Sequence, residues 1–311
     1  MGPPRQGTVP ATYRPASAAG RNYPAPPPGL SSRCRGGRRT PFSSHAGGDT
    51  GRIMIKRFNR FELKYIVSAA QAAAFQQDLL AHMRPDSHGT ADGAYAITSL
   101  YYDTADLAFM RAKREGIKFR RKLRVRRYGG DLDEPVFIEI KQRINRTTQK
   151  RRLVLPLDQA FELCAGHRAP DLTEEADAAV AGEVLFLAQG LNLQPTCITG
   201  YQRTAFVGSQ YEPGLRVTFD RSLWTAPASY GLDPAMPKYP LAPDTVQVME
   251  VKANDAVPLW LANALARHQC PLRRYSKYCA GVARLSELEL LPVAQVALAR
   301  EMAYKRRLEN G

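Results

Sequence analysis

The chain has 311 residues and a formal net charge of +15, because 44 Lys and Arg residues stand against 29 Asp and Glu residues. Hydrophobic residues make up 44% of the chain and charged residues 23%, which excludes wholesale disorder. No apolar run reaches the roughly 18 residues that a membrane-spanning helix needs. A protein this basic attracts something acidic, such as nucleic acid, an anionic membrane surface or a phosphate-rich small molecule.

The first 53 residues differ from the rest of the chain. They hold eight Arg and one Asp, are rich in Pro and Gly, and show no helix or strand period. We therefore predict a disordered leader over residues 1–53, interpreted as an extension from an early start site with Met54 as the alternative start. The leader lacks the apolar core of a secretory signal, so a cytoplasmic location is expected. An ordered domain is predicted over residues 54–290 and a C-terminal helix over residues 291–311.

Six segments from residue 57 onward alternate between apolar and charged side chains, as a half-buried strand does. In the first, "FNRFELKYIV", the charged face carries Arg60, Glu62 and Lys64. The second, "IKFRRKLRVRRY", places five cations on one face: Lys118, Arg120, Lys122, Arg124 and Arg126. The charged or polar faces of the next four, "PVFIEIKQR", "ITGYQRTAFV", "GLRVTFD" and "VQVMEVKA", include Glu139, Lys141, Arg143, Tyr201, Arg203, Arg216, Thr218, Asp220, Glu250 and Lys252.

Helical patterns lie between these segments. Ser68 and Gln71 form a capping-box signature before "AAAFQQDLLAHM", in which Phe75, Leu79 and Met83 recur at helical spacing. Further helices are predicted in "ADLAFMRAKRE", in the segment ending "VAGEVLFLAQG", and in "PLWLANALARH", "KYCAGVARLSEL" and "VAQVALAREMAYKRRLE". The elements do not alternate regularly as strand and helix, so the α+β class is favoured.

Like charges on successive strands would repel each other unless an anion lay among them. The simplest geometry that meets this need is a closed antiparallel β-barrel whose lumen is cationic and whose apolar outer face is covered by helices. Closure would also remove exposed strand edges. A nucleic-acid surface would instead place cations on an exposed face with aromatic side chains among them, so we expect no nucleic-acid partner.

A lumen of Arg and Lys suits a phosphate chain, because Arg matches phosphate oxygens with a planar fork of donors and Lys supplies a mobile point charge. A few carboxylates among them, Glu62, Glu139 and Glu250, are candidate ligands of a divalent metal that bridges phosphates. Phosphoryl transfer needs mainly positioning and charge neutralisation from the protein. No glycine-rich phosphate loop occurs, so side chains would bind any nucleotide.

The chain resembles the VTC domain family, the polyphosphate polymerase branch of the CYTH-like triphosphate tunnel superfamily. The resemblance covers roughly residues 57–285 and rests on ordered blocks. These blocks are "RFELKY", "SLYYDT", "KLRVRRYG", "VFIEIKQR", "TQKRR", "YQRTAF", "LRVTFD", "MEVK" and "YSKY". It implies an antiparallel tunnel fold and an enzyme that transfers the γ-phosphate of ATP onto inorganic polyphosphate with Mn²⁺ or Mg²⁺.

The resemblance also implies roles for single residues. Glu250 corresponds to the metal carboxylate, and Tyr201 and Ser276 to supporting hydrogen-bond donors. The implied ligands of the phosphate chain are Lys64, Arg124, Arg126, Lys141, Lys150, Arg203 and Lys277. Of these, Lys64, Arg124, Arg126, Lys141, Arg203 and Glu250 are expected to be catalytic. The other inward side chains, Arg60, Lys118, Arg120, Lys122, Lys150, Tyr201, Arg216, Lys252, Ser276 and Lys277, are expected to bind substrate.

One position departs from the hydrolytic branches of the superfamily. Triphosphatases and class IV adenylyl cyclases open with ExExK on the first strand, whereas this chain has Arg60, Glu62 and Lys64. Losing a carboxylate weakens a two-metal hydrolytic site, which favours a polymerase. The absence of an SPX domain and of a membrane segment indicates a stand-alone bacterial type, with any membrane partner unknown. The alternatives are a polyphosphate-binding module without turnover and a CYTH-like triphosphatase.

Several charged or aromatic residues have a structural interpretation instead. Arg121 and Arg127 share the apolar parity and are predicted to face solvent. Lys113 and Arg114 fall on a helix end, where cations suit the helix dipole. Tyr101 is predicted to be a core or wall residue and Asp103 to cap a turn or helix. For Arg143 and Arg152 both interpretations stay open.

Overall fold

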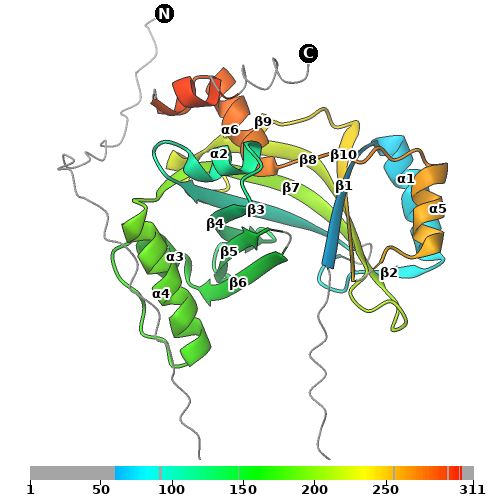
Figure 1. Cartoon of the computed structure of the whole chain (residues 1–311), viewed down its shortest axis with the longest axis horizontal. Coiled ribbons are helices and arrows are strands. Elements are labelled where there is room, and N and C mark those ends of the chain that lie inside the picture. Colours follow the sequence, from blue (N-terminus) through cyan, green and yellow to red (C-terminus); the bar gives the residue numbers. More distant parts are fainter. Residues whose placement is uncertain are drawn as a thin grey trace, which may run out of the picture. The chain divides into compact units, whose positions relative to one another are not determined.

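The fold is built around one curled antiparallel sheet of ten strands (Figure 1). The computed structural model describes residues 60–90, 93–145, 147–254, 256–292, 294–300 and 302, without the side chain of Arg60. The predictions for residues 1–53 therefore lie outside the described part. The strands are β1 (Arg60–Ser68), β2 (Met83–Pro85), β3 (Ala94–Asp103), β4 (Phe119–Tyr128), β5 (Val136–Ile144), β6 (Thr147–Leu155), β7 (Gln194–Gly208), β8 (Arg216–Pro227), β9 (Tyr239–Pro240) and β10 (Val246–Asn254).

Helices join and cover these strands, which confirms the α+β class. They are α1 (Ala69–Leu80), α2 (Ala108–Arg114), α3 (Leu157–Cys164), α4 (Glu175–Gly190), the 3-10 helix η1 (Ala228–Tyr230), α5 (Leu259–Arg267) and α6 (Lys277–Glu287). Residues 294–300 are also helical, within the predicted C-terminal helix. None of the described helices is long and apolar enough to span a membrane.

The sheet curls into a half-barrel that is not closed by strand pairing. Its order is β1-β10-β8-β7-β3-β4-β5-β6, with β2 added to β7 and β9 to β8, and all these pairs are antiparallel. Strands β1 and β6 are the two ends of this path, and no ladder joins them in the described part of the chain. The prediction of a closed barrel is therefore replaced by an open hollow between β1 and β5–β6.

A segment before α6, residues 271–276, covers the free edge of β1, and we call it the strap. Leu272 forms an isolated bridge with Tyr65, and the backbone N–H of Arg273 donates to the carbonyl of Lys64 at 2.8 Å. These contacts satisfy edge groups that strand pairing would satisfy in a closed barrel. A salt bridge across the hollow, from Lys141 of β5 to Glu62 of β1 at 2.9 Å, is a second link between the two ends.

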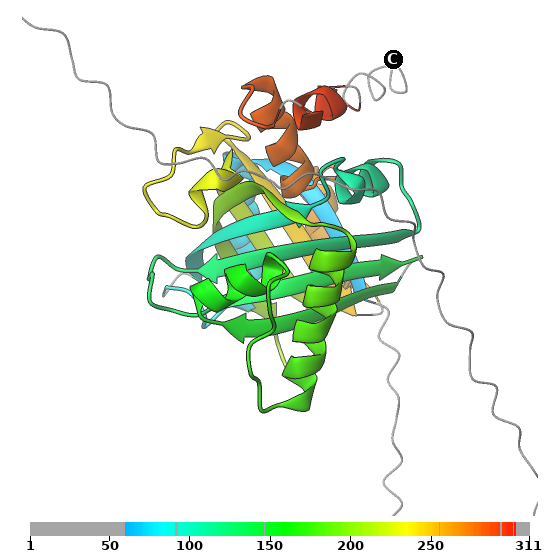
Figure 2. The same cartoon turned by 90° about the vertical axis from the view of Figure 1, so that its left-hand side faces the viewer.

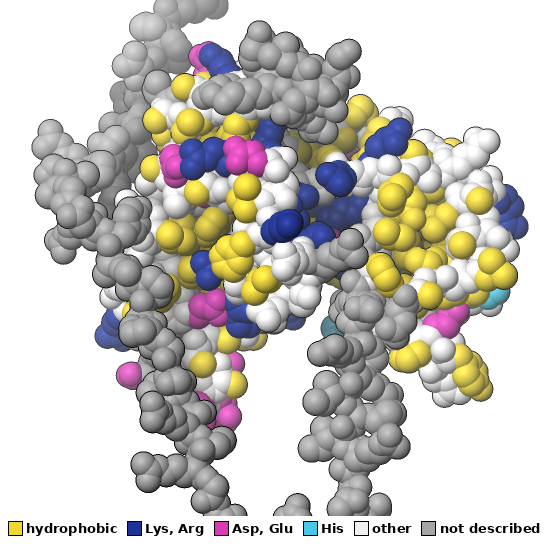
Figure 3. Space-filling view, in the orientation of Figure 1, with side chains coloured by type: hydrophobic (Ala, Val, Ile, Leu, Met, Phe, Trp, Pro, Cys, Tyr) yellow, Lys and Arg dark blue, Asp and Glu magenta, His cyan; other side chains and the backbone are white. Residues whose placement is uncertain are grey.

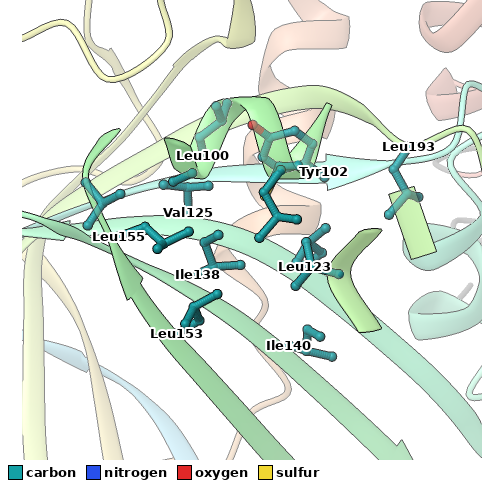
Figure 4. Packing of buried hydrophobic residues seen from close by; sticks show 14 of the residues in the cluster. Leu100, Tyr102, Leu123, Val125, Ile138, Ile140, Leu153, Leu155 and Leu193 are labelled. Atoms are coloured by element: carbon teal, nitrogen blue, oxygen red, sulfur yellow. The ribbon is translucent and has the colours of Figure 1, made fainter. Parts of the chain in front are cut away.

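Apolar side chains on the outer face of the sheet pack under helices, as predicted. Helices α1 and α5 cover β1 and β10 (Figure 1), and α3 and α4 cover β4–β6 (Figure 2). Helices α2 and α6 instead pack against Tyr101 and Cys197, which share the inward parity of Arg124, at one end of the sheet. The capping box of α1 is confirmed, with both the Ser68 and the Gln71 hydrogen bonds present. In the largest cluster, Leu123 and Val125 of β4 and Ile138 of β5 are buried between the sheet and α3–α4 (Figure 4).

Two arginines on the outer parity of β4 test the prediction that they face solvent. Arg121 stays on the outer face, where its guanidinium lies 4.6 Å from the ring centre of Phe119. Arg127 is buried, and its Nη1 donates to the carbonyl of Leu232 at 2.9 Å. The prediction for Arg127 is wrong because the connection after η1 folds over this part of the sheet and accepts the hydrogen bond.

Candidate functional site

The inner face of the half-barrel is lined by the charged residues that the alternation places opposite the core. Register brings them into rows across neighbouring strands, because Lys64 lies opposite Glu250 and Arg124 opposite Glu139. Lys and Arg side chains gather in the hollow between the part covered by α3–α4 and the part covered by α1–α5 (Figure 3). The ion pairs of this face form three groups, centred on Glu250, Asp220 and Glu139.

Glu250 of β10 holds two lysines and lies near one arginine. Lys64 Nζ is 3.0 Å and Lys252 Nζ 2.9 Å from its carboxylate, and Arg203 is 3.9 Å away. Burial alone would raise the pKa of Glu250, but these cations together with Lys277 hold it well below its usual range. Glu250 is therefore ionised in the folded protein at neutral pH.

Glu62 of β1 lies next to this group and extends it across the hollow. Lys64 Nζ is 3.3 Å from the carboxylate of Glu62, so one ammonium group joins Glu62 and Glu250. Burial and the nearby Glu250 raise the pKa of Glu62, yet Lys141 and Lys64 outweigh them and lower it. The two carboxylates offer oxygen ligands of the kind that Mg²⁺ and Mn²⁺ bind together with phosphate oxygens. The described residues contain no group of three or more His, Cys, Asp or Glu side chains placed to hold a metal, so phosphates would have to complete such a site.

Asp220 of β8 is the most buried carboxylate of the inner face and was not predicted as a site residue. Its oxygens accept two hydrogen bonds from Arg203, at 2.6 and 2.9 Å, and one from Lys277. Burial would raise its pKa, but Arg203 and Lys277 lower it to about 2. The signal was present in the sequence, since Asp220 shares the parity of Arg216 and Thr218 in "LRVTFD".

Glu139 of β5 is surrounded by cations on both carboxylate oxygens. Arg124 donates to one oxygen at 2.9 and 2.6 Å, with Arg126 3.7 Å from it, and the other oxygen contacts Lys150 at 2.6 Å and Arg152 at 2.7 Å. Burial raises the pKa of Glu139, but Arg124, Arg126 and Lys150 hold it far below its usual range. Its role as a metal ligand stays a prediction, in which a metal ion would have to displace these cations. Of the two residues left open, Arg152 belongs to this site.

Aromatic and hydroxyl side chains support the cations. The Lys277 ammonium lies 4.4 Å from the ring centre of Tyr201, and Lys122 Nζ donates to Ser276 Oγ at 3.0 Å. Ser276 also caps α6, so the start of this helix is tied to the site. These contacts place Tyr201 and Ser276 beside predicted phosphate ligands.

Tyr101 combines its predicted core position with a polar contact that the sequence did not indicate. Its ring stacks on Tyr278 at 4.9 Å between centres, and its hydroxyl accepts a hydrogen bond from Arg124 at 2.9 Å. Burial would raise the pKa of Tyr101, but Arg124, Lys122 and Arg126 lower it to about 8. The predicted capping role of Asp103 is confirmed, because its carboxylate accepts hydrogen bonds from backbone N–H groups at the start of α2.

The remaining predicted residues lie at the two ends of the inner face. Arg216 pairs with the buried Asp86 and donates to the Tyr95 hydroxyl at 2.9 Å. Lys118 is exposed just before β4, and Arg120 follows it on the same parity. The side chain of Arg60 lies outside the described part of the structure.

Comparisons with known proteins agree with this geometry at the level of the domain. The model of the VTC domain family matches residues 59–286. Subunit 4 of the vacuolar transporter chaperone complex of Trypanosoma brucei brucei is 25% identical over 229 residues, which is 61% of this chain and 28% of that protein. The chain thus spans under a third of the length of this relative.

Two solved structures resemble this chain more weakly. A candidate adenylate cyclase from Bacillus halodurans is 12% identical, with a TM-score of 0.41 over 69% of this chain and 92% of that one. The PH1819 protein of Pyrococcus horikoshii is also 12% identical, with a TM-score of 0.35 over 70% and 96%. The family assignment rests on the domain match, which covers most of the chain together with every strand that lines the hollow. This chain belongs to the VTC domain family.

Proposed function

We propose that the hollow binds inorganic polyphosphate and that the protein extends this chain with the γ-phosphate of ATP. The observation that carries the proposal is the charge balance of the inner face. Its carboxylates are Glu62, Glu139, Asp220 and Glu250, and the cations paired with them are Lys64, Arg124, Arg126, Lys141, Lys150, Arg152, Arg203, Lys252 and Lys277. This excess of positive charge remains to be neutralised, and closely spaced phosphates would supply the missing negative charge.

The cations at the open side of the hollow are those best placed to exchange partners. The side chains of Lys141 and Lys150 are 42% and 46% exposed, so both can turn from Glu62 and Glu139 to an entering phosphate. Arg203 donates to both carboxylate oxygens of the buried Asp220 and is held in place by this pair. Fixed arginines orient the phosphate groups, and mobile lysines neutralise their charge.

In the proposed reaction, an oxygen of the terminal phosphate of the chain attacks the γ-phosphorus of ATP. The bond from that phosphorus to the bridging oxygen of the β-phosphate breaks, and ADP leaves with the bond electrons. In this proposal Arg124, Arg126 and Arg203 stabilise charge on the transferring group. Glu62 and Glu250 would hold a divalent metal together with phosphate oxygens, and the bound metal would further neutralise the phosphates.

One observation favours a binding module without turnover. Each carboxylate of the inner face already contacts at least one cation, so metal binding must compete with an ammonium or guanidinium group. A triphosphatase is less well supported, because Arg60 stands where hydrolytic relatives carry a metal-binding carboxylate.

The deciding experiment incubates the full chain with ATP and Mn²⁺, detects long phosphate chains on gels and measures free phosphate separately. We expect chains from the wild-type protein and none from Arg124→Ala or Glu250→Ala. Arg121→Ala is the matched control, because it removes the same charge from the outer parity of β4. Free phosphate without chains would indicate hydrolysis. Polyphosphate binding without turnover would support the alternative of a binding module.

A further inference from the structure

The charge of the hollow is not balanced evenly along its length. Toward the second half of β4, Arg124 and Arg126 contact Glu139, and at the other wall Arg216 contacts Asp86. The start of β4 is different, because no described carboxylate lies within ion-pair distance of Arg120 or of Lys122.

Arg120 of β4 lies at this end beside three further cations, Lys113 of α2, Arg143 of β5 and Arg274 of the strap, and we call these four residues the cationic rim. Arg120 and Arg143 are directly opposite each other in the β4–β5 register. Arg143 donates only to the carbonyl of Asn145, and none of the four has an acidic partner among the described residues. Like charges directly across a strand pair destabilise the sheet unless a counter-ion lies between them.

The electrostatics of the rim agree with its geometry. Burial together with Arg143 and Arg274 lowers the pKa of Arg120. Burial together with Lys122 and Arg120 lowers the pKa of Lys113 to about 8. Neighbouring cations therefore destabilise the charged forms of Arg120 and Lys113, and an anion bound between them would remove this destabilisation.

The rim continues the inward row of the hollow. Arg120 and Lys122 are alternate residues of one strand, about 7 Å apart, and Lys122 lies opposite Lys141. A linear phosphate chain carries charge at each unit and could follow this row. A single-stranded nucleic acid would need aromatic platforms, whereas the nearby Phe119 lies on the opposite parity under Arg121.

We propose that the cationic rim is a separate subsite for the part of a polyphosphate chain that extends beyond the balanced centre of the hollow, and that it makes the protein prefer long chains to short ones. This inference rests on the proposed function. Tripolyphosphate is held at the centre and does not reach the rim. Longer chains contact both.

The test measures binding of tripolyphosphate and of long-chain polyphosphate to the full chain by isothermal titration calorimetry. The rim variant is Arg143→Gln with Arg274→Gln. The control variant is Arg121→Gln with Arg168→Gln, which removes the same charge from the outer parity of β4 and from an exposed position after α3. We expect the rim variant to bind long chains about tenfold more weakly and tripolyphosphate within twofold of wild type, with the control unchanged for both.

If the rim variant bound both ligands more weakly by the same factor, or bound long chains as tightly as wild type, the proposed rim subsite would be wrong and the proposed function would be unaffected. If the wild-type protein bound neither ligand, both the proposed function and the proposed rim subsite would be wrong. A rim variant that lost affinity for a single-stranded oligonucleotide and kept its affinity for long-chain polyphosphate would also overturn the proposal.

Discussion

Asp220 shows that the role of a residue can depend on ion pairs that the sequence does not reveal. Its side chain is fully buried and accepts hydrogen bonds from Arg203 and Lys277, yet in the sequence it is one acid among 29 Asp and Glu residues. Alternation predicts that it faces inward, but it does not predict which cations reach it. That choice depends on strand register and on the strap, which brings Lys277 in from a distant part of the sequence.

We expect Asp220→Asn to lower the free energy of unfolding by about 3 kcal/mol, because it removes the carboxylate that pairs with the buried Arg203 and the partly buried Lys277. Urea denaturation followed by circular dichroism measures this change. Asp133→Asn, at an exposed position before β5, is the control and should leave the midpoint unchanged. The folded state lowers the pKa of Asp220 to about 2 from 3.8, so its contribution is complete above pH of about 4 and is lost as the pH falls toward 2. Wild type and variant should therefore converge in stability over that range, and a constant difference would contradict the assignment.

Tyr101 gives a spectroscopic test of the cationic site. We expect one tyrosine to ionise near pH 8, because Arg124, Lys122 and Arg126 favour the phenolate despite burial. Absorbance of the phenolate during a pH titration measures it, and Tyr101→Phe should remove this transition while Tyr211→Phe, at an 85% exposed position, should not. Since the folded pKa lies below the ordinary value of 10, Tyr101 should add stability as the pH rises from about 8 to about 10.

At the scale of elements, periodicity predicted the strands whose two faces differ and missed those whose faces are alike. The six alternating segments form β1, β4, β5, β7, β8 and β10. Strand β3 has no such alternation, because its second half is buried on both faces between its neighbours and the helices above. Strand β6 is an edge strand with mostly exposed residues at its start, and α3 is short, so neither gives a strong pattern.

A glycine in β7 shows how packing between strands restricts the residue type at one position. A Cβ on Gly200 would lie 2.0 Å from the ring of Trp224, next to the irregularity in the β7–β8 register. We expect Gly200→Ala to destabilise the protein by about 2 kcal/mol, because the ring must move within a packed layer. Thermal unfolding measures the loss. Gly182→Ala in α4, where a Cβ would meet nothing within 4 Å, is the matched control and should stabilise the helix by up to about 1 kcal/mol. Equal effects of the two changes would contradict this account.

At the scale of the whole molecule, the inner face carries more cations than carboxylates, so an anion that binds there should stabilise the folded state. We expect tripolyphosphate to raise the unfolding temperature, since it binds the folded protein and not the unfolded chain. The rise should shrink as NaCl increases from about 0.05 to about 0.5 M, because salt screens the charges at the open side of the hollow. Sodium sulfate at matched ionic strength is the control, and an equal rise with sulfate would indicate general charge screening and no phosphate-chain site.

For the six alternating strands, the amino-acid pattern alone predicts which residues point inward, which pack outward, and that the inward set is mainly cationic. These properties follow from the two-residue period of a strand, which is local. Three features emerge only in the folded chain: the sheet stays open between β1 and β6, the strap covers the β1 edge, and Glu139, Asp220 and Glu250 each hold a different set of cations. Those outcomes depend on curvature, register and contacts between residues far apart in the chain, which no local pattern contains.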